Sequence, residues 1–301
     1  MEVISASRRT DIPACYADWF MNRVRAGYCV VEHPFSRQRS RVSLLPEAVV
    51  AIAFWTRNPA PLLPYLGELD GRGFKFLFNF TVTGYGPELE PAGPDPRAAV
   101  EVFRRLSDRL GAALVHWRYD PIVITDEMDP DWHRRHFEAL CRKLEGYTHR
   151  CVISFLQLYR KNQPRMEAAA RAGRFRYGYL PVRTVTPGRF GWVLPQEVMC
   201  GLAQDLGGIA AAYGIRVYSC CNPFLVAPLA NVHPGRCLDG DLIGALRADL
   251  AALPALRPSR PGCGCVAARD LGAYDRCGHG CVYCYATGSK VCTADPYAEK
   301  L

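Results

Sequence analysis

Long apolar stretches are missing from this sequence. No run of about 18 apolar residues occurs without a charge, and the first nine residues, MEVISASRR, lack the apolar segment of a secretory signal. Low-complexity linkers and internal repeats are missing as well. These absences argue against a helical membrane span, a repeat array and a disordered chain, and they lead us to expect a cytoplasmic protein with no membrane partner.

A dense run of basic residues is also missing. The 37 lysines and arginines exceed the 29 aspartates and glutamates, which gives a net charge of +8, but the arginines are spread along the chain. Most of them are typical of solvated helix faces, and some are typical of anion contacts in a site. Nucleic acid is therefore a partner that the charge permits but that the pattern does not support.

What is present is an alternation of apolar runs with segments of helical periodicity, in a chain of 301 residues that is 49% hydrophobic. The pattern predicts strands at 3–7, 49–55, 74–82, 113–119, 152–158 and 215–219, and helices at 16–26, 94–110, 132–144 and within 196–213. This alternation predicts parallel strands joined by crossover helices.

We therefore expect an α/β protein, with a complete or partial (β/α) TIM-type barrel over residues 1–252. A cysteine-rich tail, residues 253–301, is expected to pack on the barrel. Its weak hydrophobic periodicity indicates that it needs a metal or the barrel beneath it in order to fold. The irregular segment 173–191 is expected to form a loop over the barrel mouth.

Polar side chains follow each of the first five expected strands. The strand ends of a β/α barrel usually supply its chemistry, and the planar fork of arginine suits bidentate binding of a carboxylate or phosphate. Each of these residues also has an ordinary alternative as a helix cap or half of an ion pair. The residues expected at the barrel mouth are Arg8, Arg9, Asp11, Arg57, Asn58, Arg118 and Asp120.

Cysteine is abundant and unevenly distributed. Where thiols stay reduced, 14 cysteines favour metal ligands and small buried residues over a disulfide framework. Cys15, Cys29, Cys141, Cys151 and Cys200 stand singly in periodic apolar segments, so each is expected to be a small buried residue. The others fall in the last third of the chain: Cys220, Cys221, Cys237, Cys263, Cys265, Cys277, Cys281, Cys284 and Cys292.

The stretch CGHGCVYCYA, residues 277–286, places three cysteines where they can turn onto one small object. Zinc sites made of four thiolates generally use two pairs of C-x2–4-C type; Cys281 and Cys284 form one such pair, and Cys263-x-Cys265 would be a poor second. An iron–sulfur cluster instead takes thiolates from a curled loop whose N–H groups point at the sulfurs, and the glycines on either side of His279 permit that curl. Disulfides are a third alternative. We expect His279 to be a loop residue instead of a ligand.

Cys277-x3-Cys281-x2-Cys284, with Tyr283 directly before the last cysteine, resembles the CxxxCxΦC signature of radical S-adenosylmethionine enzymes. In that superfamily three cysteines hold a [4Fe–4S] cluster whose fourth iron binds the amino and carboxylate groups of the cofactor. The usual members carry the signature early in the chain, whereas here it lies near the C-terminus. The whole chain resembles an uncharacterised family, domain of unknown function 1848, and parts resemble spore photoproduct lyase, a DNA-repair radical enzyme. The segments that carry the family resemblance are Ser5 to Pro13, Phe54 to Pro59, Arg118 to Pro121 and Cys263 to Ala286.

The resemblance implies reductive cleavage of S-adenosylmethionine to a 5′-deoxyadenosyl radical that acts on an unknown substrate, with a reductant such as flavodoxin or ferredoxin as partner. It implies that Cys277, Cys281 and Cys284 hold the cluster. The carboxylates at the barrel mouth are then expected to bond the ribose or amino group of the cofactor, and the arginines to anchor its carboxylate or an anionic substrate. The residues expected to be catalytic are Arg8, Arg9, Asp11, Arg118 and Asp120, and those expected to bind the cofactor are Thr56, Arg57, Asn58 and Tyr283. The alternatives are an iron–sulfur electron-transfer protein and a zinc-stabilised barrel that binds nucleic acid.

A second set of thiols lies upstream of the signature. Cys237, Cys263, Cys265 and one of Cys220 and Cys221 make four ligands, enough for an auxiliary [4Fe–4S] cluster without an open iron. We expect such a cluster. The alternative is that Cys220 and Cys237 are merely buried and that the CGC sequence is an ordinary turn.

Overall fold

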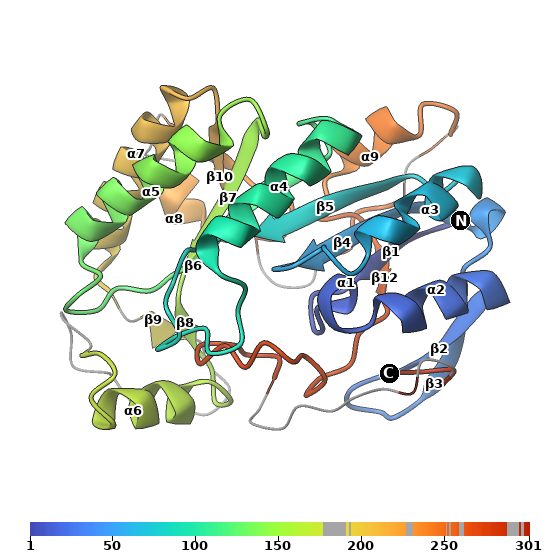
Figure 1. Ribbon diagram of the computed structural model, residues 1–301, viewed down its shortest axis with the longest axis horizontal. Helices are drawn as coiled ribbons and strands as arrows, with labels where there is room; N and C mark the ends of the chain where they lie inside the picture. The colour runs from blue at the N-terminus through green and yellow to red at the C-terminus, as the bar shows by residue number, and fades with distance from the viewer. Residues whose placement is uncertain are drawn as a thin grey trace. The chain divides into compact units, whose positions relative to one another are not determined.

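The protein is described here by a computed structural model, which places residues 1–176, 191–192, 194–226, 231–250, 252, 254–258, 262–287, 295 and 298–301. The predicted loop 173–191 lies largely outside these residues, and so does Cys292. The chain is a mixed α/β protein with a large sheet of eight strands (Figure 1). The strand order is β11 (Val232–Pro234), β10 (Arg216–Ser219), β7 (Arg150–Phe155), β6 (Val115–Ile122), β5 (Phe76–Thr81), β4 (Val49–Thr56), β1 (Glu2–Ala6) and β12 (Ala268–Asp270).

The main strands form where the sequence is continuously apolar. In β4, whose sequence is VVAIAFWT, every residue except Trp55 is buried, as expected of a parallel strand that is covered on both faces. β1 and β5 are similarly buried along nearly their whole length. The predicted strand and helix alternation is confirmed, because helices separate most of these strands along the chain.

Two of the longer helices begin at an aspartate cap followed by proline. Asp95 accepts hydrogen bonds from the backbone of Arg97 and Ala98 at the start of α4 (Pro96–Leu110). Asp129 does the same for Trp132 in α5 (Pro130–Leu144). A side-chain oxygen that satisfies these first N–H groups, together with a proline whose φ is already helical, fixes where a helix begins.

The remaining helices include α7 (Gln196–Ala211), which has 16 residues, and none of the helices in the described part of the chain has the length and hydropathy to cross a membrane. The helices are α1 (Ile12–Cys15), α2 (Ala17–Ala26), α3 (Leu66–Gly71), α6 (Gln163–Arg171), α7 (Gln196–Ala211), α8 (Pro223–Val226) and α9 (Gly240–Leu246), with 3-10 turns η1 (Pro46–Ala48) and η2 (Leu63–Tyr65). Two antiparallel pairs complete the list: β2 (Tyr28–Glu32) with β3 (Arg39–Ser43), and β8 (Gln157–Leu158) with β9 (Gly191–Trp192).

The chain divides into two compact units. Unit 1 contains residues 1–80, 236–278 and 289–301, and unit 2 contains residues 81–235 and 279–288. The tail predicted as a separate segment, 253–301, therefore contributes residues to both units. A separate barrel domain over 1–252 stays a prediction.

Unit 1 is built around the parallel strands β12, β1 and β4, with β5 beside β4. Val3 pairs with Ala268 on one side and with Ala51 on the other, so the first and last strands that the structure describes are neighbours. The core on this sheet is aromatic: the Phe54 ring stacks on Phe78 with centroids 4.8 Å apart. Such offset ring pairs add to the free energy gained by burying their apolar area.

Unit 2 contains the parallel strands β6, β7, β10 and β11, and α5 contributes a buried histidine to its core. His133 is fully buried. Its Nε2 donates to the Val123 carbonyl oxygen at 3.0 Å, and Tyr119 donates its hydroxyl proton to Nδ1 at 2.7 Å. The neutral ring thus satisfies both of its nitrogens, and burial lowers the pKa of His133 from 6.5 to about 4.

This histidine predicts a loss of stability in mild acid. The unfolded chain takes up a proton at His133 below about pH 6.5, whereas the folded chain does so only near its pKa of about 4. The free energy of unfolding should therefore fall by about 3 kcal/mol as the pH drops through this window. Urea titrations at pH 7 and pH 4.5 measure it. His133→Gln, which cannot titrate, should be less stable at pH 7 and should show a smaller fall; an equal fall in both proteins would contradict the assignment.

Candidate metal centre

The loop after β1 is fixed by one carboxylate from the tail, Asp270 on β12. Its Oδ1 accepts hydrogen bonds from Ser7 Oγ at 2.7 Å and from Arg9 Nε at 3.1 Å. Its Oδ2 accepts from Ser5 Oγ and from the backbone N–H of Arg8, both at 3.0 Å. The side chain of Asp270 is only 17% exposed, so these charge-assisted bonds form in a largely desolvated place, where they are strong. Arg9, predicted to be catalytic, is therefore half of an ion pair.

The same loop is tied to the tail by two further residues. Thr10 Oγ1 donates to the Ala273 carbonyl at 2.6 Å and accepts from the Ala273 N–H at 3.1 Å. Gly272 lies so close to Ser7 that an added Cβ would come within 2.0 Å of its Oγ. Only glycine fits there without a shift of the backbone, which explains the glycine at this position.

Asp11, a second residue predicted to be catalytic, joins the ends of β1 and β4. One carboxylate oxygen caps α1 by accepting from the Ala14 N–H at 3.0 Å, and the other accepts from the Arg57 N–H at 2.7 Å. Thr56 Oγ1 in turn accepts from the Asn58 N–H at 2.9 Å. The structure thus brings the predicted residues of these two strand ends together and shows the structural bonds that they make; their roles in catalysis and cofactor binding stay predictions.

Arg8 points toward an aromatic partner on the neighbouring strand end. Its guanidinium carbon lies 5.8 Å from the centroid of the Trp55 ring, within the range of a cation–π contact. This contact and the bond from its backbone to Asp270 fix a positive charge at the end of β1. Such a charge suits an anionic ligand.

Arg118 and Asp120 lie two residues apart on β6 in unit 2, so they share a face of the sheet. They form an ion pair, with side chains 11% and 18% exposed, and Ser154 of β7 donates its hydroxyl to the other oxygen of Asp120. Arg118 and Asp120 therefore contact one another within unit 2, as half-buried partners of an ion pair. The pair's part in catalysis stays a prediction.

The cysteine loop, residues 279–287 of unit 2, is hydrogen-bonded to an arginine on the first turn of α6. Arg165 donates from Nη1 to the Cys281 carbonyl oxygen at 3.0 Å and from Nη2 to the Cys284 carbonyl oxygen. Because these two carbonyls are bonded to a cation, they cannot turn toward the cysteine sulfurs. The backbone between the two cysteines is closed further by a bond from the Cys284 N–H to the Cys281 carbonyl at 3.1 Å.

Two residues just before α6 bind further carbonyls of the cysteine loop. Asn162, which is buried, donates from Nδ2 to the Tyr283 carbonyl at 2.7 Å. Lys161 donates from Nζ to the Ala286 carbonyl at 3.2 Å. The carbonyl oxygens of four loop residues are thus held by side chains of one short segment, residues 161–165.

The apolar side of the cysteine loop packs into the core of unit 2. Tyr283, predicted to bind the cofactor, is buried, and its hydroxyl donates to Glu90 Oε1. Thr83 donates its hydroxyl to the same oxygen at 2.6 Å. Cys281 and Tyr283 belong to one hydrophobic cluster with Met166 of α6. Tyr283, the aromatic residue of the signature, therefore anchors the cysteine loop to the core of unit 2.

The other end of the cysteine loop is fixed by His279. Its Nδ1 donates to the Ala92 carbonyl at 3.2 Å, and its own carbonyl accepts from the Ala92 N–H at 3.2 Å. Gly280 follows with a φ of +65°, a conformation that side chains disfavour. His279 is thus a hydrogen-bonded loop residue, and Gly280 supplies the tight curl predicted for this stretch.

The donors around these thiols fit a thiolate-bound metal. The Ala286 N–H points at Cys284 Sγ at 3.3 Å, the arrangement by which backbone amides surround the sulfurs of iron–sulfur clusters. Arg165 Nε is buried and has no hydrogen-bond partner among the described residues, so one more donor lies beside the loop. Two thiols with N–H donors near them are compatible with a cluster and also with zinc.

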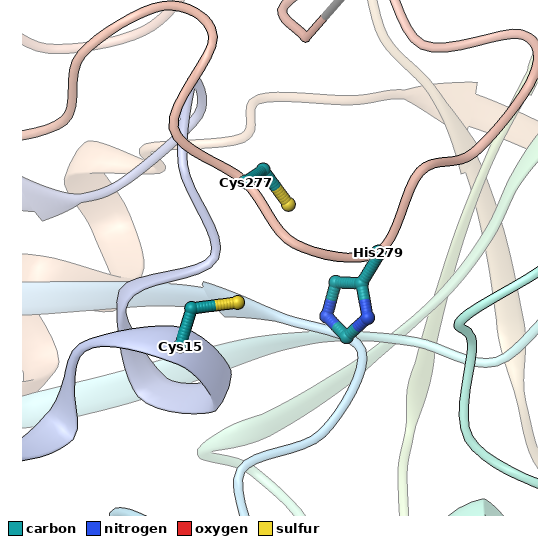
Figure 2. A group of neighbouring side chains, drawn as sticks. All are labelled: Cys15, Cys277 and His279. Carbon is teal, nitrogen blue, oxygen red and sulfur yellow. The ribbon is translucent and has the colours of Figure 1, made fainter. Parts of the chain in front are cut away.

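Cys277 belongs to unit 1 and has a neighbour that the sequence did not indicate. Its thiol and that of Cys15, at the end of α1, lie within 4.8 Å of one another, and Figure 2 shows the two side chains on adjacent segments. His279, also labelled there, follows Cys277 by two positions along the chain. The tail before Cys277 is anchored by Tyr16, whose hydroxyl donates to the Arg276 carbonyl at 2.5 Å.

The upstream thiols fall into two groups. In unit 1, Cys265 Sγ accepts from the Leu238 N–H at 3.4 Å, which places this thiol beside the segment that carries Cys237. Cys263 is buried and separated from Cys265 by one glycine. In unit 2, the sulfurs of Cys220 and Cys221 lie 3.5 Å apart. Whether these groups share a metal stays a prediction.

The isolated cysteines behave largely as expected. Cys29, Cys141 and Cys151 are buried; burial raises the pKa of Cys29 to about 12 and raises those of Cys141 and Cys151, as for inert thiols. Cys200 is partly buried and bonds to a backbone carbonyl. Cys15 corrects the prediction, because it is exposed; it ends a four-residue helix, where the apolar pattern is too short to show which face is inward.

Several residues of the site escaped the sequence-based prediction. Asp270 lies in a polar three-residue strand, and Glu90 and Arg165 lie outside any motif. Nothing in their local sequence connects them to the segments that they bind. A buried acid in an otherwise apolar environment can be noticed only once burial is known.

A family model described as Domain of unknown function (DUF1848) matches residues 3–286. No curated protein matches the chain.

Proposed function

The chain belongs to the DUF1848 family, and from that premise we propose that it is a radical S-adenosylmethionine-type iron–sulfur enzyme. Cys277, Cys281 and Cys284 hold a [4Fe–4S] cluster in this proposal. Its substrate is unknown, and a flavodoxin or ferredoxin serves as reductant.

The observation that carries the proposal is the construction of the cysteine loop. Its carbonyls are bound by Arg165, Asn162 and Lys161, while a backbone N–H faces the Cys284 sulfur. A zinc ion needs only four thiolates or imidazoles in a tetrahedron. A cluster is larger and carries sulfides that also accept hydrogen bonds, so the one loop amide that faces the Cys284 sulfur supports the cluster.

When bound, a cluster with an open iron supplies the electron that cleaves S-adenosylmethionine reductively to a 5′-deoxyadenosyl radical. The protein's part is to bind and orient the cofactor and the substrate and to exclude water. We assign anion binding to Arg8, held near Trp55, and hydrogen bonding of the cofactor to Thr56 and Asn58. Arg118 and Asp120 are assigned to the substrate side.

Two finer features belong to the same proposal. The eight parallel strands form a complete or partial TIM-type barrel, whose strand ends carry the proposed ligand-binding residues. Cys237, Cys263, Cys265 and either Cys220 or Cys221 hold an auxiliary [4Fe–4S] cluster. The hydrogen bond that Cys265 Sγ accepts from the Leu238 N–H supports this second site.

Anaerobic purification, reconstitution with iron and sulfide, and reduction in the presence of S-adenosylmethionine test the proposal. We expect a brown protein with broad absorbance near about 400 nm, about eight irons per chain if both clusters form, and 5′-deoxyadenosine as a product. Iron without 5′-deoxyadenosine would point to electron transfer instead. A colourless protein with zinc and no iron would refute the cluster.

Zinc is the second candidate because of Cys15. Its thiol lies within 4.8 Å of the Cys277 thiol in unit 1, and two thiolates with a histidine nearby in the chain are typical zinc ligands. In that case the metal would be structural, and Cys15 would be essential for holding it.

A further inference from the structure

We propose that Arg165 is a positioning residue for the metal centre: it orients the cysteine loop and places a positive charge beside two ligand residues. The inference rests on the proposed metal site at Cys281 and Cys284. It adds a residue from α6 that lies outside the cysteine signature and about 120 positions before it in the chain.

The first step is geometric. The two Nη atoms of one planar guanidinium bind the carbonyls of Cys281 and Cys284, the two cysteines of the cysteine loop, so the fork fixes the distance between those two peptide groups. In a trans peptide the N–H lies opposite the C=O. Holding the Cys284 carbonyl on Arg165 therefore directs the next N–H, that of Tyr285, away from α6.

The second step concerns burial. Arg165 is partly buried, and its Nε is a buried atom without a partner among the described residues. Asn162, three residues before Arg165, is buried and already donates its side-chain N–H to the Tyr283 carbonyl. An arginine in such surroundings costs desolvation free energy, which its two carbonyl bonds offset only while the loop is in place. The arginine and the loop therefore order one another.

The third step is electrostatic. A cubane held by three thiolates is anionic, and each electron added makes it more so. A fixed guanidinium next to the ligand backbone favours the reduced form, because the charge and hydrogen bonds around a cluster set its reduction potential. Lys161, on the Ala286 carbonyl, adds a second cation at the other end of the loop.

Three variants separate geometry from charge. Arg165→Gln removes both the fork and the charge, whereas Arg165→Lys keeps the charge and loses the fork. Arg171→Gln is the matched control, because Arg171 lies on the same helix with a side chain 71% exposed and pairs only loosely with Glu167, at 3.8 Å. Circular dichroism confirms that each variant is folded.

Two readouts that do not depend on turnover are used. Apoprotein is titrated with Co²⁺, followed by sulfur-to-metal charge-transfer absorbance, and reconstituted protein is titrated for its reduction potential. We expect Arg165→Gln to bind Co²⁺ about 10- to 100-fold more weakly, as other outer-shell changes do, and to favour the oxidised cluster by about tenfold, a shift of about 59 mV to lower potential. Arg165→Lys should lose Co²⁺ affinity with little change in potential, and Arg171→Gln should match the wild type.

The outcomes distinguish this inference from the proposed function. Equal Co²⁺ affinity in wild type and Arg165→Gln would overturn the positioning role, even if the wild type makes 5′-deoxyadenosine. Weaker Co²⁺ binding in the variant would support it, even if the wild type never carries a cluster. If Arg165→Gln does not fold, Arg165→Lys decides: wild-type Co²⁺ affinity in that variant overturns the inference.

Discussion

Replacing Cys281 or Cys284 with alanine should remove the open cluster and lower 5′-deoxyadenosine formation by more than about 100-fold, since even outer-shell substitutions cost about 10- to 100-fold. Cys277→Ala should have the same effect. The physical reason is that a cubane with one free iron has no spare ligand, so two thiolates cannot hold it in place. Iron content, absorbance near about 400 nm and product formation are measured on each reconstituted variant.

Cys15 and Cys200 make this experiment decisive. Cys200→Ala is the matched control, because its thiol bonds only to the Phe224 carbonyl among the contacts described for it, and it should keep both metal and activity. Cys15→Ala should also keep the cluster if the signature cysteines hold it. Loss of the metal in Cys15→Ala, with zinc in the wild type, would replace the radical proposal by the structural zinc site.

Replacing Asp270 with asparagine should destabilise unit 1 by about 2–4 kcal/mol. The carboxylate accepts hydrogen bonds from Ser5, Ser7, Arg8 and Arg9, and an amide carries N–H groups that cannot accept from those donors. Arg9 would also lose its counter-charge in a place where its side chain is only 15% exposed. The midpoint of urea unfolding measures the effect.

A control for Asp270 lies on the same pair of strands. Arg269 of β12 pairs with Glu2 of β1 at 3.1 Å, with both side chains about half exposed. Glu2→Gln should shift the free energy of unfolding by less than about 1 kcal/mol, because exposed ion pairs contribute little. Similar midpoints for Asp270→Asn and Glu2→Gln would show that Asp270 is an ordinary surface acid.

The sequence predicted the parts of the fold that repeat a simple apolar pattern. The run VVAIAFW at 49–55 became β4 (Val49–Thr56), and the helix expected at 94–110 became α4 (Pro96–Leu110). It did not predict β12, because Ala-Arg-Asp at 268–270 has no apolar alternation, nor the β2 and β3 pair, whose second strand, RSRVS, buries only Val42. Tertiary pairing and not local propensity makes these strands.

The site divides in the same way. Spacing and residue type were enough to single out Cys277, Cys281 and Cys284 as predicted metal ligands, because ligands that come from one short loop leave a recognisable spacing; their binding of a metal stays a prediction. The residues that hold the loop, Arg165 and Glu90, could not be found in this way. A side chain that binds a backbone carbonyl 116 positions away needs no particular neighbour in the sequence, so it leaves no pattern.

The pairing of β1 with β12 has a consequence for biosynthesis. Ser5 and the carboxylate that it binds are 265 positions apart, so β1 leaves the ribosome long before β12, the strand that pairs with its edge. At about 5–20 residues per second, its open edge is exposed for tens of seconds during each round of translation. A nascent chain truncated before residue 268 would keep that edge unpaired and become a natural client for chaperones.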